Sequence, residues 1–96
     1  MLTIPQIKTI VTRICKKYGV KNAYLFGSYA KGQADSQSDI DLIIDKGDIH
    51  TYRDYFHFHQ ELEDSLGTKV DLTSEEGMFP KFFNLIKNDR IMLYGA

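Results

Sequence analysis

Apolar side chains recur at helical spacing near the N-terminus of the chain. Thr3 and Gln6 have the spacing of a capping box ahead of this stripe, and Gly19 follows it as a stop signal. We therefore predict a helix over Ile4–Tyr18. Its apolar stripe consists of Ile7, Ile10, Val11, Ile14 and Tyr18.

Three shorter segments are rich in apolar side chains or alternate them with polar ones, as β-strands do. We predict strands over Val20–Phe26, Asp39–Asp45 and Thr68–Thr73. Residues 27–38, between the first two, are small and polar, so we expect a short helical turn that continues as a loop. In the second strand the residues that face the core are Ile40, Leu42 and Ile44.

Two more helical patterns follow in the second half of the chain. We predict helices over Thr51–Leu66 and Pro80–Asn88, and either an edge strand or a packed tail over Ile91–Tyr94. The inward face of the first of these helices is assigned to Tyr52, Tyr55, His59, Leu62 and Leu66. Phe58 lies off that face, and a core position and a partner contact are equally good interpretations of it.

The alternation of these elements predicts the fold class. Helices and strands alternate without an internal repeat, a linker or a low-complexity tract. We expect one α/β (α+β) domain over residues 1–96, with a small mixed β-sheet and helices packed on one face. A chain of this length is near the small end of what builds its own core.

Composition and charge narrow the classes of function. The formal net charge of −1 argues against a strong nucleic-acid binder, which would need a basic field. Cys15 is the single cysteine, so an internal disulfide or a cysteine-based zinc site is excluded, and a reducing compartment fits. The N-terminus does not resemble a secretion signal, and no apolar run is long enough to span a bilayer. We expect a cytoplasmic protein without a membrane partner.

The strongest chemical signal is Asp39-Ile40-Asp41 on a predicted strand. The period of two places both carboxylates on one face, close enough to share a cation, while the opposite face anchors the strand in the core. Oxygen donors favour Mg²⁺ or Mn²⁺ over zinc. Taken alone, the pair is more often a solvated strand face.

Two further features change that balance. Gly27 and Ser28 lie where the first strand turns into a short helix, a place where backbone N–H groups and a hydroxyl can bind phosphate. Asp71 lies on the third strand, on the side away from the core, so it joins the first two acids if the two strands are neighbours. Each feature alone has an ordinary structural explanation, but their combination indicates a site.

The charges of such a site indicate its chemistry. Asp39 and Asp41 would hold metal ions that stabilise the attacking and leaving oxygens of a phosphoryl displacement. Asp71 would help to deprotonate the attacking hydroxyl. Ser28 and the loop amides would orient the phosphates of a nucleotide, and Lys31 would neutralise them.

These residues resemble the signature of the DNA polymerase β-type nucleotidyltransferases. The matching strings are Gly27-Ser28-Tyr29-Ala30-Lys31-Gly32 and Ser38-Asp39-Ile40-Asp41-Leu42, and Asp71 has the position of the third carboxylate. The resemblance covers nearly the whole chain and is closest to the minimal nucleotidyltransferases of prokaryotes. Lys31 departs from the family, which more often has arginine there, and lysine loses the bidentate grip on phosphate.

The resemblance implies the family's fold, its carboxylate triad as metal ligands and a partner. Minimal members pair with a small all-helical protein of the HEPN fold as a toxin–antitoxin module. It implies Mg²⁺ (or Mn²⁺) as cofactor, ATP as donor substrate and transfer of AMP to a hydroxyl of the partner in a hetero-oligomer. The acceptor itself is not fixed by fold or motif.

Two other interpretations stay open at this stage. The chain could be a non-catalytic antitoxin that neutralises a helical partner by steric contact, although a binder has no need for three placed acids. It could also be a transferase that acts on a small molecule or an RNA end, which the near-neutral charge and the small size disfavour. His57 and His59 lie two residues apart on a helix and make a poor metal pair.

Overall fold

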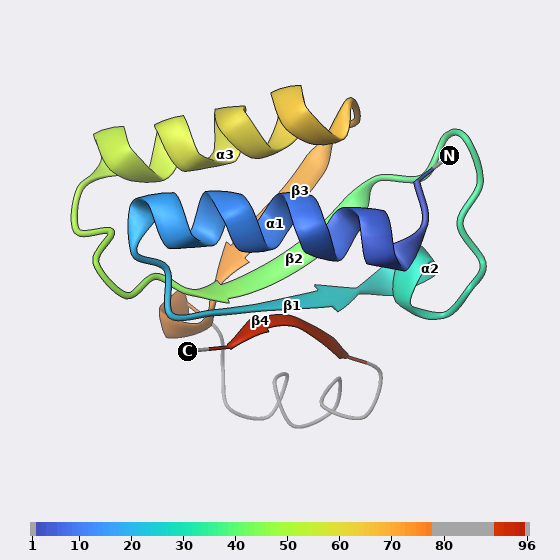
Figure 1. Cartoon of the computed structure of the whole chain (residues 1–96), viewed down its shortest axis with the longest axis horizontal. Helices are drawn as coiled ribbons and strands as arrows, with labels where there is room; N and C mark the ends of the chain where they lie inside the picture. Colours follow the sequence, from blue (N-terminus) through green and yellow to red (C-terminus); the bar gives the residue numbers. More distant parts are fainter. Residues whose placement is uncertain (1, 78–89, 96) are drawn as a thin grey trace.

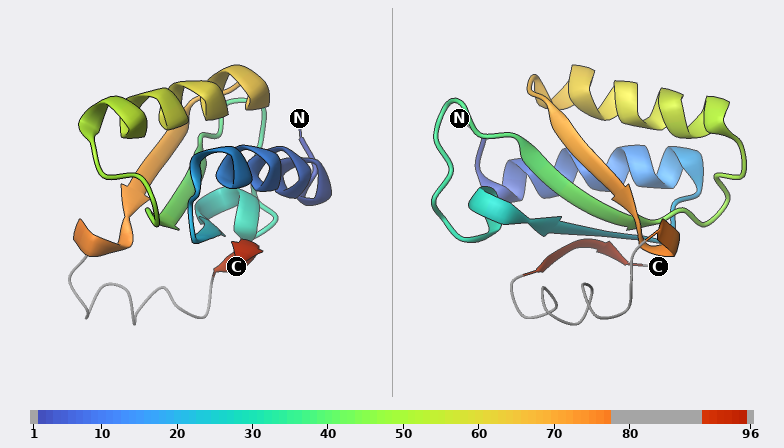
Figure 2. Two further views of the ribbon diagram at one scale, coloured as in Figure 1. Left: turned by 60° about the vertical axis from the view of Figure 1, so that its left-hand side comes forward. Right: turned by 180° about the vertical axis from the view of Figure 1, so that it is seen from behind.

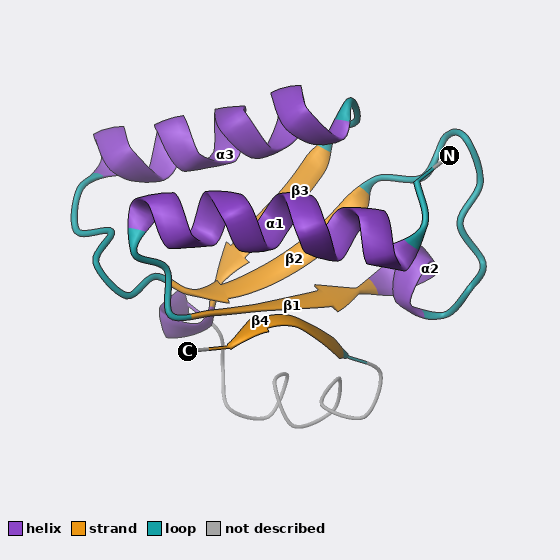
Figure 3. Ribbon diagram, in the orientation of Figure 1, coloured by secondary structure: helices purple, strands orange, loops and turns teal. Residues whose placement is uncertain are grey.

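A computed structural model describes residues 2–77 and 90–95 of the chain. Their elements, coloured by type in Figure 3, are helix α1 (Ile4–Tyr18), strand β1 (Asn22–Phe26), the short helix α2 (Gly27–Ala30), strand β2 (Ile40–Asp45), helix α3 (Tyr52–Leu66), strand β3 (Val70–Ser74), the single-turn 3₁₀ helix η1 (Glu75–Gly77) and strand β4 (Ile91–Gly95). None of the described helices combines the length and apolar character that crossing a membrane requires. The predicted helix over Pro80–Asn88 lies outside the described residues.

The strands form one mixed sheet in the order β3-β2-β1-β4. β1 is antiparallel to both of its neighbours, whereas β2 and β3 run parallel. Figures 1 and 2 show α1 and α3 side by side over one face of this sheet. The α/β class, the mixed sheet and the helices on one face are therefore confirmed. β4 is an edge strand, which decides between the two alternatives for Ile91–Tyr94.

The core lies between the two helices and the sheet. The capping box predicted for α1 is present, because the Gln6 N–H donates to the Thr3 hydroxyl and the Thr3 N–H donates to the Gln6 side chain. Burial raises the pKa of Cys15 to about 12. The core-facing residues of β2 are buried against the helices as predicted; these are Ile40, Leu42 and Ile44. A second, smaller cluster contains Tyr24, Phe26 and Ile43.

The strand boundaries differ from the predicted ones by one or two residues. β2 begins at Ile40 and not at Asp39, because the Ile40 N–H makes a hydrogen bond of 3.0 Å to the Lys69 carbonyl at the start of the ladder with β3. β3 correspondingly covers Val70–Ser74 and not Thr68–Thr73. Asp39 therefore lies just before its strand, in the end of the loop.

The inward face of α3 was predicted correctly at Leu62 and Leu66 but incorrectly in its first half. Phe58 is fully buried and packs edge-to-face on Tyr18, with ring centroids 5.5 Å apart, so it is a core residue and not a partner contact. Tyr52, expected to point inward, is 94% exposed. The true inward face is centred on Phe58, Leu62 and Leu66, which turns Tyr55 and His59 to its margin. The apolar pattern of this aromatic-rich helix did not distinguish a central from a marginal position.

A sharp corner joins β1 to α2 at Gly27. Gly27 has a φ of +70°, a conformation in which a side chain is strained. A Cβ at this position would also overlap the Asp41 Oδ2 atom. Gly32, five residues later, has the same φ of +70° but open space around the position of a Cβ. The backbone can approach the Asp41 carboxylate only because residue 27 has no side chain.

We expect Phe58→Ala to lower the free energy of unfolding by about 3–5 kcal/mol, because it removes a fully buried ring. The matched control is Phe56→Ala on the same helix, where Phe56 is 62% exposed. That change should stay within about 0.5 kcal/mol. Chemical denaturation of both variants checks the difference, and equal losses would contradict the corrected orientation of α3.

We expect Gly27→Ala to destabilise the protein more than Gly32→Ala. Both variants take on backbone strain of about 1–2 kcal/mol, but only the first also forces Asp41 aside. This overlap should add about 1–3 kcal/mol, the usual range for overpacking. The comparison is made by thermal unfolding, and indistinguishable midpoints would show that Asp41 does not lie against Gly27.

Candidate active site

Asp41 and Asp71 lie directly beside each other in the sheet. The parallel pairing of β2 and β3 sets Asp41 opposite Asp71, between the pairs Ile40–Val70 and Leu42–Leu72. Since the neighbours of both acids face the helices, the two carboxylates lie on the other face. The pairing of strands that the sequence left open is therefore present, and it brings together two acids that are far apart along the chain.

The electrostatics of Asp41 reflect this arrangement. Burial raises the pKa of Asp41, and the negative charges of Asp71 and Asp39 raise it further, as does a side-chain hydrogen bond with Asp71. Neighbouring negative charges and burial both oppose the ionised form of a carboxyl, so the charged form of Asp41 is costly where it lies. A bound cation would offset the repulsion between these negative charges.

Asp39 lies outside the strand on which it was predicted, and it is exposed like Asp71, whereas Asp41 is half-buried. It lies before β2 and reaches Asp41 through its charge. Within residues 2–77 and 90–95, no three acidic, histidine or cysteine side chains converge in the geometry of a metal site. The sheet thus fixes the pair Asp41–Asp71, and Asp39 stands next to this pair at the end of a loop.

The predicted phosphate-binding residues lie at the same end of the sheet. Phe26, the last residue of β1, is paired with Asp41, so Gly27 and Ser28 follow directly beside that acid. Ser28 is half-buried, and its hydroxyl has no hydrogen-bond partner among the described residues. Lys31 is exposed at the end of α2, where its N–H donates to the Gly27 carbonyl.

Sequence reasoning missed one residue close to these acids. Burial raises the pKa of Tyr55, and the negative charge of Asp71 raises it further, so the phenol of α3 lies within electrostatic reach of the third acid. The helical pattern placed Tyr55 in the core, and only the pairing of α3 with β3 shows that it borders the site. Spacing alone could not reveal this.

The donor set suits a hard divalent cation. All three candidate ligands are carboxylates, and oxygen donors of this kind bind Mg²⁺ and Mn²⁺. The absence of a side chain at Gly27 lets the corner between β1 and α2 come up to Asp41. A divalent cation would offset the repulsion between the two adjacent carboxylates. A nucleotide phosphate could approach that cation beside the backbone at Gly27.

Comparison with known proteins shows the family of the chain. The family model described as "Polymerase beta, Nucleotidyltransferase" matches residues 8–96. A relative from Methanocaldococcus jannaschii, provisionally named a protein adenylyltransferase, is 33% identical over 90 residues, which are 94% of this chain and 97% of that protein. The protein adenylyltransferase MntA of Thermococcus cleftensis is 32% identical over 82 residues, 81% of this chain and 83% of the relative.

A solved structure shares the fold. It is the complex of a tri-AMPylated HEPN toxin with an MNT antitoxin from Shewanella oneidensis, a chain of which superposes with a TM-score of 0.73 at 19% identity, covering 98% of this chain and 74% of that chain. At that identity the likeness concerns the fold. The family model and the two relatives show that the sequence is similar as well. The chain therefore belongs to the polymerase β-type nucleotidyltransferase family.

Proposed function

We propose that this chain is a Mg²⁺-dependent protein adenylyltransferase, which transfers AMP from ATP to a hydroxyl of a partner protein. The observation that carries the proposal is the pairing of Asp41 with Asp71 beside the corner at Gly27. A protein that acts by steric contact gains nothing from two acids held against each other, because their repulsion only costs stability. The names of the two relatives support the same activity.

The three acids share one role in this proposal, and Asp71 has a second one. Asp39, Asp41 and Asp71 would hold the metal, and Asp71 would also take the proton from the acceptor hydroxyl. Mg²⁺ bound there would stabilise the attacking and leaving oxygens of an in-line displacement. The acceptor oxygen forms a bond to the α-phosphorus of ATP while the bond to the β-phosphate oxygen breaks. Pyrophosphate leaves, and the proton passes through Asp71 to solvent.

The corner between β1 and α2 binds the triphosphate. Ser28 donates a hydrogen bond to a phosphate oxygen, and its hydroxyl is free for this role among the described residues. Gly27 lets the phosphates approach the backbone next to Asp41. Lys31 adds positive charge from the end of α2, where it is exposed.

The acceptor is a small all-helical HEPN-type protein, with which the chain forms a hetero-oligomer as an antitoxin in the cytoplasm. Support for this part comes from the complex of a tri-AMPylated HEPN toxin with an MNT antitoxin, whose fold this chain shares. A protein acceptor also fits a chain without a basic field for nucleic acid, since its formal net charge is −1.

The test is incubation of the purified chain with ATP, Mg²⁺ and the HEPN-type protein encoded beside it, followed by intact-mass measurement of that protein. We expect a mass increase of one AMP per modified hydroxyl, which maps to a tyrosine, serine or threonine. A stable complex in which the partner keeps its mass would favour steric neutralisation. AMP on a small molecule or an RNA end would favour the third interpretation.

We expect Asp41→Asn to lower the rate of AMP transfer by roughly a hundredfold or more, since indirect partners of metal sites already cost about 10–100-fold. The metal-free variant should also be more stable than the wild type at neutral pH. The raised pKa means that the folded protein binds this proton more tightly than the unfolded chain, so stability falls as the pH rises above the ordinary value of 3.8.

The control for Asp41→Asn is Asp64→Asn, at an exposed acid of α3. It should change neither the rate nor the unfolding midpoint in the presence of a chelator. Wild-type activity in the Asp41 variant would remove this acid from the site. An unfolding midpoint of Asp41→Asn below that of the wild type would show that the folded protein already compensates the charge of Asp41.

We expect Ser28→Ala to raise the KM for ATP by about 10–100-fold, which corresponds to a charge-assisted hydrogen bond of about 1.5–3 kcal/mol. The same change at Ser36, an exposed residue of the following loop, is the control. Initial rates over a range of ATP concentrations measure both. An unchanged KM in the Ser28 variant would take its hydroxyl out of the phosphate contacts.

A further inference from the structure

Among the described strands β3 lies at the edge of the sheet, so another strand pairs with only one of its sides. Backbone groups of a strand alternate between its two sides. The Lys69 carbonyl bonds to the Ile40 N–H, so the groups of Lys69 and Asp71 face β2. The groups of Val70 and Leu72 therefore face away from the sheet, one on each side of Asp71.

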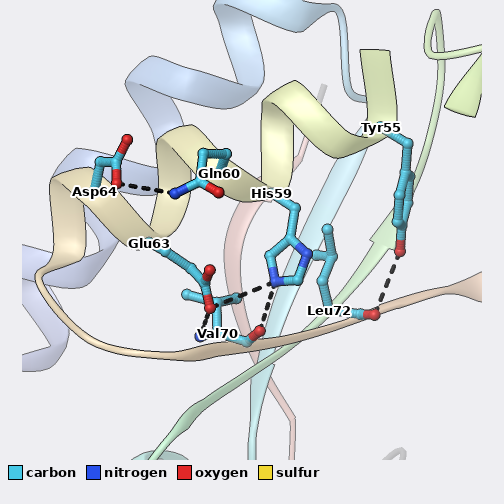
Figure 4. A network of polar contacts seen from close by, with 7 residues as sticks. All are labelled: Tyr55, His59, Gln60, Glu63, Asp64, Val70 and Leu72. Atoms are coloured by element: carbon cyan, nitrogen blue, oxygen red, sulfur yellow. Dashed lines mark hydrogen bonds and ion pairs between the residues drawn. The ribbon is translucent and has the colours of Figure 1, made fainter. Parts of the chain in front are cut away.

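Helix α3 supplies hydrogen-bond partners for this outer side (Figure 4). Glu63 Oε2 accepts from the Val70 N–H at 2.9 Å, and His59 Nε2 donates to the Val70 carbonyl at 2.7 Å. The Tyr55 hydroxyl donates to the Leu72 carbonyl at 3.3 Å. His59 Nε2 also lies 3.7 Å from Glu63 Oε2.

The spacing of these three side chains matches the strand they hold. Tyr55, His59 and Glu63 follow one another at intervals of four residues, so they form one row along the flank of α3. All three are half-buried, which limits competition from water. This row takes the place of a neighbouring strand at the edge of the sheet.

We propose that Tyr55, His59 and Glu63 are positioning residues for Asp71. The three side chains make hydrogen bonds to Val70 and Leu72 on the outer side of β3, while β2 pairs with Asp71 on the inner side. These contacts on both sides restrict rotation of β3 about its axis. The direction of the Asp71 carboxylate toward Asp41 follows from this clamp. A metal site needs its ligands held within about half an ångström, and hydrogen bonds on both sides of β3 restrict Asp71 more than the pairing with β2 alone.

The inference rests on the proposed function, because it assigns a purpose to the orientation of Asp71. The electrostatic interaction of Tyr55 with Asp71 adds support to the hydrogen bonds. Burial raises the pKa of this phenol, and the negative charge of Asp71 raises it further, so a change at Tyr55 is made close to the acid and not at a remote part of the helix.

The other flank of α3 offers a matched control. There the Tyr18 hydroxyl donates to Glu61 Oε1 at 3.1 Å, and Lys17 pairs with the same atom at 2.8 Å. Tyr18 is half-buried like Tyr55, and its hydrogen bond holds α3 to α1 without touching β3. Tyr55→Phe and Tyr18→Phe thus remove the same atom and one helix attachment each, but only the first loosens the strand of Asp71.

The experiment compares these two variants by transfer kinetics and by Mn²⁺ affinity, the latter from the EPR signal of free Mn²⁺. We expect Tyr55→Phe to lower kcat and Mn²⁺ affinity roughly tenfold, as loss of an indirect partner does in metal sites, with the KM for ATP unchanged. Tyr18→Phe should leave kcat and Mn²⁺ affinity as in the wild type. Equal values for the two variants would overturn the inference.

A second pair of variants separates positioning from folding. Glu63→Gln keeps an oxygen that accepts from the Val70 N–H, whereas Glu63→Ala removes it. We expect the first to retain kcat and the second to lose it roughly tenfold, with unfolding midpoints recorded for both. Loss of kcat in the glutamine variant as severe as in the alanine variant would contradict a role through this hydrogen bond.

Failure of the proposed function gives a different result. A wild-type chain that transfers no AMP but binds Mn²⁺ would reject the adenylyltransferase activity, and the Mn²⁺ affinities of Tyr55→Phe and Tyr18→Phe would then decide the inference alone. A tenfold difference between them supports the clamp, and equal affinities reject it.

Discussion

The parallel pairing of β2 with β3 places two negative side chains next to each other on one face of the sheet. Such a contact opposes folding, since burial and the neighbouring charges both raise the pKa of Asp41. The sheet tolerates it because the alternate residues of the same strands are firmly buried: Ile40, Leu42 and Val70 all lie in the main core. The burial of the apolar face thus offsets the cost of placing the two acids together on the other face.

The surrounding elements serve this arrangement in different ways. Helix α1 packs over β1 and the edge strand β4, and its Thr12 hydroxyl donates to the Leu93 carbonyl of β4. The corner at Gly27 brings backbone up to Asp41, and no other residue type fits there without displacing the acid. Helix α3 packs on the core through Phe58, Leu62 and Leu66 and bonds to the edge of β3 through its flank. The same helix therefore contributes to the core and, through its hydrogen bonds to β3, to the orientation of Asp71.

Much of this site was predictable because it depends on local spacing. A period of two predicts a common side for Asp39 and Asp41, and the apolar neighbours of Asp71 turn that acid to the face of Asp41. The glycine before Ser28 marks the corner. The register of the sheet was not predictable, because which strand pairs with which is decided by contacts between distant segments. Asp39 illustrates the limit, since it lies one residue outside its strand where the ladder begins at Ile40. The prediction for the inward face of α3 was wrong for a related reason. Several aromatic side chains lie close together on this helix, and only the packing of distant segments, such as Tyr18 against Phe58, shows which of them is buried.

The most direct test is a crystal structure of the chain with Mn²⁺ and an ATP analogue that does not release pyrophosphate. The anomalous scattering of manganese would locate the metal ion in this structure. The account predicts manganese coordinated by Asp41 and Asp71 together, with Asp39 drawn in from the loop end and the triphosphate against Gly27 and Ser28. Manganese bound away from β2 and β3, or a carboxylate of Asp71 turned from that of Asp41, would contradict it.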